Sequence, residues 1–385
     1  MARAVISGLS PIPKLPGETF GLRCAHLSRA SDVVSAIGVL ARPAKDLSVV
    51  FSVVLFLLCA AAIYLSCEYF VNGIEWVGRR LGVSATATGT VLAAFGTALP
   101  ESAVTFVAVV FGHNTAQKEI GVGAAVGGPL VLSTISYAVV GIVLWFSRRK
   151  LQRANTELQL DTQRLSSDQA WFLLIFVVAL ALGLVSFPFK RWFGILLFGA
   201  YALYVWREMT TRHSKEHDDE QLEPLKFRSK DPNPSLVWAS LQTLAALLVI
   251  AIASRTFVGQ LENIGTYLGI SPQLVALILS PVATELPETL NALIWVRQGR
   301  ERLALANISG AMMIQATVPA GLGVLFTTWR FDPPLVIAAS TATVAVILLW
   351  LMFRRGRVNG ASLVPLGLLY VLFALAVAFF HIAVR

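Results

Sequence analysis

The sequence has few charged residues and few side chains of the kinds that build disulfides or soft-metal sites. Asp, Glu, Lys and Arg make up 14% of its 385 residues, whereas 56% are hydrophobic, and the mean hydropathy is +0.70. A water-soluble domain of this length needs a much more polar surface, so the composition excludes one. Cys24, Cys59 and Cys67 have no metal-ligand spacing and the five histidines form no cluster, which excludes a disulfide framework and a His/Cys metal site.

The sequence also lacks the motifs of the common enzyme classes. It contains no His-Glu-x-x-His zinc motif, no glycine-rich phosphate-binding loop and no serine or cysteine nucleophile beside a base. We therefore expect a protein that is not an enzyme and has no resident cofactor. Its formal net charge of +9 is explained by the predicted membrane topology, so nucleic acid is not an expected partner.

Long apolar runs dominate the rest of the sequence. A transmembrane helix needs about 20 apolar residues, and ten such runs are centred on residues 49–72, 85–110, 120–146, 169–187, 192–207, 235–256, 271–295, 303–327, 334–353 and 361–382. The sequence therefore predicts an all-α membrane protein with ten transmembrane helices. The predicted organisation is a disordered tail at 1–47, a first five-helix repeat at 48–207, a cytoplasmic linker at 208–233 and a second five-helix repeat at 234–385.

One segment of the chain occurs twice. The stretch from Phe70 to Glu101 aligns without a gap to the stretch from Phe257 to Glu288, with about a dozen identical positions that include Gly, Pro and Glu. Both copies end in Thr-x-Leu-Pro-Glu. Because each repeat contains an odd number of predicted spans, the second repeat must enter the membrane from the opposite side. The sequence thus predicts two inverted five-helix repeats, an arrangement that is typical of transporters.

Basic residues are unevenly distributed between the two sets of predicted loops. The loops after the first, third, fifth, seventh and ninth predicted helices contain most of them, for example Arg80, Arg148 and Arg354. The positive-inside rule places these loops in the cytoplasm and both termini outside it, although the basic residues of the N-terminal tail oppose this orientation. The loops are short, as in many prokaryotic membrane proteins, so we expect the inner (plasma) membrane of a bacterium.

The repeated Thr-x-Leu-Pro-Glu element places oxygen atoms inside an apolar run. Proline has no N–H group, so the carbonyl four residues earlier in a helix loses its hydrogen-bond partner. Such carbonyls persist at membrane depth only where protein or a water-lined cavity satisfies them. The predicted oxygen donors are the carbonyls of Gly96 and Ala283, the hydroxyls of Thr97 and Thr284, and the carboxylates of Glu101 and Glu288. Hard oxygen ligands of this kind suit Ca²⁺ or Na⁺.

The two carboxylates carry the functional prediction. An ionised acid near the centre of a transmembrane helix costs about 2.5–3.5 kcal/mol, so Glu101 and Glu288 at matched positions of a repeat need a reason. We expect both to face one cation site at the membrane midplane between the repeats. The alternative is that both are protonated or lie in interfacial loops.

These segments resemble a known family. Residues 95–101 (FGTALPE) and 282–288 (VATELPE) are similar to the two signature segments of the calcium/cation antiporter superfamily, which includes the sodium/calcium exchangers, and residues 80–84, 123–127 and 306–310 also resemble that family. The resemblance implies a ten-helix inverted-repeat antiporter whose second and third helices of each half form the ion site. It further implies that the first helix of each half slides to switch access.

Carried over residue by residue, the resemblance makes Glu101 and Glu288 the principal ligands and lets Thr97 and Thr284 contribute oxygens. The transported ions are then Ca²⁺ and either Na⁺ or H⁺. The sequence departs from the family where the third and eighth helices usually provide serine, amide or acid side chains. The residues at these positions are Gly128, Pro129, Leu132, Ala311 and Met312.

Three polar side chains remain as further candidate ligands, namely Glu285, Asn307 and Gln315. Glu285 stands where the family commonly has a small polar residue, and at three residues before Glu288 it lies near the same helix face. It would bring a third carboxylate to the site. The alternative is that Glu285 is a protonated packing residue or a charge in the cytoplasmic vestibule.

The sequence therefore predicts a cation antiporter that exchanges Ca²⁺ for Na⁺ or H⁺ by alternating access. The alternatives are a monovalent cation/H⁺ antiporter and a degenerate paralogue that keeps the fold without transporting. A channel is disfavoured, because a repeated Pro-Glu break in two inverted halves favours alternating access. The expected partners are small inorganic cations and the lipid bilayer, and the sequence makes no prediction of oligomeric state.

Overall fold

A computed structural model of the chain describes residues 20–81, 85–148, 158, 160–211, 223–356 and 358–384, and for 20–48, 85–97, 208–211 and 380–384 it describes the backbone alone. Contacts divide the chain into two compact units, Met1–Phe51 and Ser52–Arg385. Helix α1 (Phe20–Arg80) begins in the first unit. Residues 20–47 are thus helical where the sequence predicts a disordered tail. They are rich in Ala, Leu and Arg, which favour helix, and Pro43 is their one proline.

The described part of the second unit is built from helices. After α1 these are α2 (Ala85–Val110), α3 (Thr115–Val131), α4 (Tyr137–Ser147), α5 (Thr162–Leu184), α6 (Phe193–Thr211), α7 (Leu236–Leu268), α8 (Pro272–Thr284), α9 (Leu286–Arg297), α10 (Glu301–Phe326), α11 (Pro333–Arg354), α12 (Gly360–Leu363) and α13 (Leu366–Val384). A π-helical turn, Leu132–Ser136, joins α3 to α4. The predicted linker at 208–233 lies partly outside the described residues.

Seven helices within the described ranges are long and apolar enough to cross a membrane. They are Val49–Arg80, Thr115–Ser147, Thr162–Leu184, Leu236–Leu268, Glu301–Phe326, Pro333–Arg354 and Gly360–Phe379. The predicted apolar runs at 85–110 and 192–207 coincide with α2 and α6, and the run at 271–295 forms two helices, α8 and α9. The prediction of an all-helical membrane protein is confirmed, and the arrangement of ten helices in two repeats stays a prediction.

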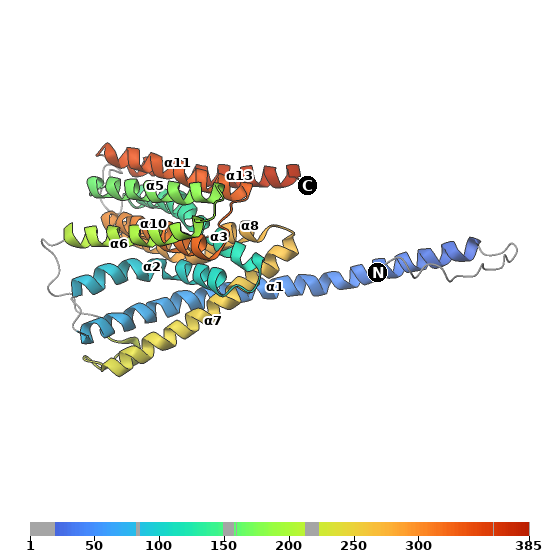
Figure 1. Cartoon of the computed structure of the whole chain (residues 1–385), viewed down its shortest axis with the longest axis horizontal. Coiled ribbons are helices and arrows are strands. Elements are labelled where there is room, and N and C mark those ends of the chain that lie inside the picture. Colours follow the sequence, from blue (N-terminus) through green and yellow to red (C-terminus); the bar gives the residue numbers. More distant parts are fainter. Residues whose placement is uncertain are drawn as a thin grey trace. The chain divides into compact units, whose positions relative to one another are not determined.

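The long helices of the second unit run side by side, so most of their connections lie at its two ends (Figure 1). At one end the α2–α3 connection meets α7, since Asn114 donates a hydrogen bond to Glu262. The α5–α6 and α10–α11 connections also meet, since the Lys190 Nζ donates to the Trp329 carbonyl. The end of α1 and the start of α7 lie together at the opposite end (Figure 1).

Helix α3 packs directly on α8 through glycines. A methyl group at Gly123 would lie 2.2 Å from the Gln273 carbonyl oxygen, and one at Gly127 would lie 2.7 Å from the Leu277 carbonyl oxygen. Small residues spaced four apart let two helix backbones approach this closely inside a membrane. Pro281 lies in the interior of α8 and has no N–H for the Leu277 carbonyl, so that carbonyl faces α3. The close α3–α8 contact positions the polar residues described below.

Helices α1 and α7 form a second packed pair. The rings of Phe56 and Phe257 stack with centroids 4.6 Å apart. Near the other end of the pair, the buried Gln242 amide on α7 donates to the Tyr69 carbonyl on α1 and accepts from the backbone N–H of Phe227. Gln242 therefore has a packing role. It ties α1, α7 and the segment before α7 together.

Candidate functional site

Glu101 lies in the interior of α2 with 1% of its surface exposed. The helix continues through Pro100 from Ala85 to Val110. The sequence predicts that Thr97 and the Gly96 carbonyl accompany this carboxylate. The side chain of Thr97 and the surroundings of Gly96 lie outside the described residues, so this half of the site is represented by Glu101.

The matching element in the second half interrupts the helix. Helix α8 ends at Thr284, α9 begins at Leu286, and Glu285 lies between them. The halves differ because Pro281 precedes this element, whereas the repeat has Ala94 at the matching position. Two prolines six residues apart remove two helical hydrogen-bond donors, and the helix breaks where the carbonyls are left without partners. The break places Glu285 between two helix ends and Glu288 in the first turn of α9.

Thr284 connects the two halves. Its Oγ1 lies 2.5 Å from Glu101 Oε2, 3.1 Å from the Ser280 carbonyl oxygen and 3.3 Å from Glu285 Oε1. A hydroxyl has a single proton to donate, so it satisfies one of these three acceptors at a time. The remaining oxygens need a proton on a carboxyl group or a cation. Such a cluster of acceptors is the chemistry of a cation site.

Helix α10 adds an amide to this cluster. Gln315 is fully buried, and neither its Oε1 nor its Nε2 makes a well-formed hydrogen bond to any described group, although its amide faces the Glu285 carboxylate. A methyl group built on Gly128 of α3 would lie 2.8 Å from Gln315 Oε1 and 3.1 Å from Glu285 Oε1. The amide and the carboxylate therefore share one small space against the bare backbone of α3.

The three carboxylates are buried, and no basic side chain within the described ranges pairs with them. Glu285 has 1% and Glu288 has 2% of its surface exposed, and the carboxylates of Glu101, Glu285 and Glu288 are close enough to repel one another. Glu288 also lies near Cys67 of α1. Lys190 is the one buried basic residue among the described side chains, and its Nζ donates to the Val185 and Trp329 carbonyls instead. Isolated buried charges are too costly to persist, so this cluster requires cations or protons.

The predictions that Asn307 and the Ala283 carbonyl are ligands stay predictions. Asn307 lies on α10 eight residues before Gln315, about 12 Å along the helix axis. The methyl group of Ala283 packs in an apolar cluster with helices α1 and α7. Among described residues, no three His, Cys, Asp or Glu side chains are grouped closely enough to hold one metal ion by themselves. The oxygen donors are mixed, with carboxylates, a hydroxyl and an amide.

Several buried hydroxyls were missed by the reasoning from sequence. Ser280 is fully buried one turn before Thr284, and its Oγ reaches no partner in the described structure. Thr105, one turn after Glu101, is buried in the same way. The signal was available, because each is a hydroxyl within an apolar run at four residues from a predicted ligand. Helix spacing places such pairs on one face.

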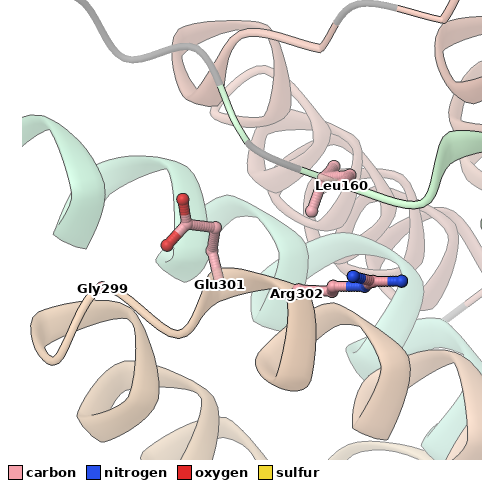
Figure 2. A pocket seen from close by; sticks show the side chains of 4 residues that line it. All are labelled: Leu160, Gly299, Glu301 and Arg302. Carbon is pink, nitrogen blue, oxygen red and sulfur yellow. The ribbon is translucent and has the colours of Figure 1, made fainter. Parts of the chain in front are cut away.

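A separate cavity of about 340 Å³ lies at the end of the bundle where α10 begins, lined by Leu160, Gly299, Glu301 and Arg302. Figure 2 shows the Glu301 and Arg302 side chains projecting from the first turn of α10. Glu301 precedes Gln315 by about 21 Å of helix rise. This cavity is therefore distinct from the carboxylate cluster.

The sequence matches a protein-family model described as "Sodium/calcium exchanger protein". The match covers two stretches, residues 51–209 and 238–380, which together make up more than half of the chain. These stretches nearly coincide with the two predicted repeats, 48–207 and 234–385. The predicted resemblance to the calcium/cation antiporter superfamily is confirmed.

Two relatives align over most of the chain. The putative antiporter CaxA of Alkalimonas amylolytica is 25% identical over 321 residues, which are 80% of this chain and 94% of that protein. The inner membrane protein YrbG of Escherichia coli K12 is 25% identical over 269 residues, which are 70% of this chain and 78% of that protein.

Two solved structures share the fold. The H⁺/Ca²⁺ exchanger CAX matches with a TM-score of 0.66 and 18% identity, over 84% of this chain and 82% of its own. The sodium-calcium exchanger NCX_Mj matches with a TM-score of 0.52 and 20% identity, over 84% of this chain and 98% of its own. At these identities the likeness establishes the fold alone.

Proposed function

We propose, since the chain belongs to the sodium/calcium exchanger family, that it is an integral membrane antiporter that exchanges Ca²⁺ for Na⁺ or H⁺ at the cluster around Thr284. In this proposal Glu101, Glu285 and Glu288 supply the charge, and the Thr284 hydroxyl and the Gln315 amide supply neutral oxygens. The family consists of transporters rather than enzymes. The proposal needs no resident cofactor, because the cations are the cargo.

One observation carries the proposal. The Thr284 hydroxyl lies within hydrogen-bonding distance of Glu101 from the first half and of Glu285 from the second. Acidic oxygens from both halves thus meet at one buried point without a basic side chain among the described residues. A divalent ion or two monovalent ions would balance two of the three negative charges, and a proton or a further cation would balance the third.

The fold supports a ten-helix, inverted-repeat arrangement. The family match falls in two stretches, 51–209 and 238–380, and most connections between the long helices lie at two ends of the bundle (Figure 1). The same proposal places the ends of α1, α4 and α11 in the cytoplasm. There Arg79, Arg148 and Arg354 each lie over a tryptophan ring at 5.1–5.7 Å from its centroid. Arginine and tryptophan gather in this way at membrane interfaces.

Coupling of the two fluxes follows from shared ligands. Both ions need the same carboxylates, so one must leave before the other binds. The site crosses the low-dielectric barrier only when an ion neutralises it, because moving uncompensated buried charge is costly. The protein therefore exchanges one ion for the other and does not let either ion leak alone.

A monovalent cation/H⁺ antiporter is the second candidate. Ca²⁺ usually takes six to eight oxygens, and α3 offers no side-chain oxygen at Gly128, Pro129 or Leu132. A smaller set of donors suits Na⁺. A third candidate is a protein of this fold that does not transport, because the same oxygen donors are missing.

The test is ion uptake into proteoliposomes of purified protein. Radiocalcium uptake is measured with an imposed Na⁺ gradient in one set and a pH gradient in another, and ²²Na⁺ uptake is measured with a pH gradient. We expect calcium uptake under one gradient and its loss in Glu101→Gln. Glu262→Gln is the matched control, because Glu262 accepts hydrogen bonds from Asn114 and Gln117 at the end of the bundle. Sodium uptake alone would identify the second candidate, and folded protein without any uptake would contradict transport.

A further inference from the structure

We infer that Gly128 determines the ion preference of this site, because its missing side chain makes the space in which Glu285 and Gln315 act together as cation ligands. The inference rests on the proposed function. It concerns a residue that binds no ion itself and that supplies no side-chain oxygen. Gly128 acts by leaving room for the side chains of Glu285 and Gln315, which come from other parts of the chain.

The space is defined by two short distances. A methyl group on Gly128 would lie 2.8 Å from Gln315 Oε1 and 3.1 Å from Glu285 Oε1. Carbon and oxygen atoms that are not bonded pack at about 3.5 Å or more, so even alanine at this position would displace both oxygens. The neighbouring Gly127 has a different role, since a methyl group there would meet the Leu277 carbonyl and the Pro281 ring.

The side chains that occupy this space are suited to a cation. Both polar atoms of Gln315, as well as Glu285 Oε2, are buried and reach no well-formed partner in the described structure. A buried amide without partners is unfavourable by about 1–3 kcal/mol. Gln315 Oε1 and Glu285 Oε1 both border the position of a Gly128 methyl group, and two oxygen acceptors that share one space repel each other. A cation between Gln315 Oε1 and Glu285 relieves both terms, and hard oxygens of this kind are the ligands that Na⁺ and Ca²⁺ take.

The internal repeat shows how the two halves differ. Ala98 stands at the position that matches Glu285, and it packs in an apolar cluster with Ile314 and Tyr201. The second half therefore supplies the extra carboxylate and the amide, and the first half supplies the space at Gly128. A side chain at 128 and a long acid at 285 exclude each other.

The experiment is a double-mutant cycle on calcium and sodium binding. Wild type, Gly128→Ala, Glu285→Ala and the double variant are purified in detergent, and each is titrated with Ca²⁺ and Na⁺ by isothermal calorimetry. We expect Gly128→Ala to lower the affinity for the preferred ion at least tenfold when Glu285 is present. In the Glu285→Ala background it should weaken binding less than twofold, because the ligand that it displaces is already absent.

Gly310→Ala is the matched control. Gly310 lies on α10, and a methyl group there would meet nothing within 4 Å, so binding should stay within twofold of wild type. Ion-free melting temperatures verify that the variants fold. Equal losses from Gly128→Ala in both backgrounds would mean a general packing defect and would overturn the inference alone. Wild-type protein that binds neither ion would overturn the proposed function and this inference with it.

Discussion

The Thr284 hydroxyl on α8 lies 2.5 Å from the Glu101 carboxylate on α2, although 183 residues separate them in the chain. This contact joins the two copies of the repeated element at one point. It also gives Thr284 more acceptors than its one proton can satisfy, since the Ser280 carbonyl and Glu285 lie within 3.3 Å as well. Because these acceptors outnumber the one hydroxyl proton, the candidate site favours added positive charge, from a cation or a proton.

Replacing Thr284 by valine should weaken cation binding about tenfold. A hydrogen bond to a charged group contributes about 1.5–3 kcal/mol, and about 1.4 kcal/mol corresponds to a factor of ten. Calorimetric titration of Thr284→Val and Thr284→Ser measures the effect, with serine retaining most of the affinity. Thr343→Val is the control, because the Thr343 hydroxyl donates to the Ala339 carbonyl of its own helix. Equal cation affinities of Thr284→Val and Thr343→Val would show that Thr284 is not part of the site.

Replacing Glu285 by serine should change the ion preference. The change removes one of three buried negative charges, and a divalent ion loses more attraction than a monovalent one. We expect the ratio of calcium to sodium affinity to fall about tenfold, an electrostatic change of about 1.4 kcal/mol. Competition of Na⁺ against radiocalcium uptake at several pH values measures it. An unchanged ion and pH profile would make Glu285 a packing residue.

Replacing Gly127 by alanine should destabilise the fold. Its methyl group would lie 2.6 Å from the Pro281 ring and 2.7 Å from the Leu277 carbonyl oxygen, so α3 and α8 would have to separate. Overpacking of this kind costs about 1–3 kcal/mol. The loss of stability is measured by heating the protein in detergent and monitoring how much of the monodisperse chromatographic peak remains. Gly199→Ala on α6 is the control, since its methyl group would meet nothing within 4 Å; matched stabilities would contradict the close α3–α8 contact.

Replacing Gln242 by leucine should loosen the α1–α7 pair. The substitution removes the acceptor of the Phe227 N–H and the donor to the Tyr69 carbonyl and the Asn72 side chain, and each such hydrogen bond contributes about 0.5–1.5 kcal/mol. The expected result is a lower melting temperature in detergent. Asn263→Leu on the same helix is the control, because Asn263 is exposed and bonds only weakly to Gln260 at 3.4 Å. A melting temperature equal to that of the control would show that this packing contributes nothing.

The sequence by itself determined the class of protein and the principal acids. Apolar runs of bilayer length are a local property, so helices form where the runs predict them, and the duplicated Thr-x-Leu-Pro-Glu element identified Glu101 and Glu288 because acids are rare at membrane depth. The same local reasoning placed residues 1–47 in a disordered tail, whereas residues 20–47 are helical. Its inclusion of Asn307 among the ligands stays a prediction, and Asn307 lies two turns before Gln315 on α10.

Only the tertiary structure decided which oxygens meet. The Leu277 carbonyl, which Pro281 leaves without a helical donor, faces α3, and only the packing of α8 on α3 reveals this. The space that Glu285 and Gln315 share exists because Gly128 arrives from a helix more than 150 residues away in sequence. A pattern of residue types predicts the secondary structure and the environment that one segment prefers. The distance between side chains of different helices is set by how closely their backbones pack, and here glycines on α3 set it.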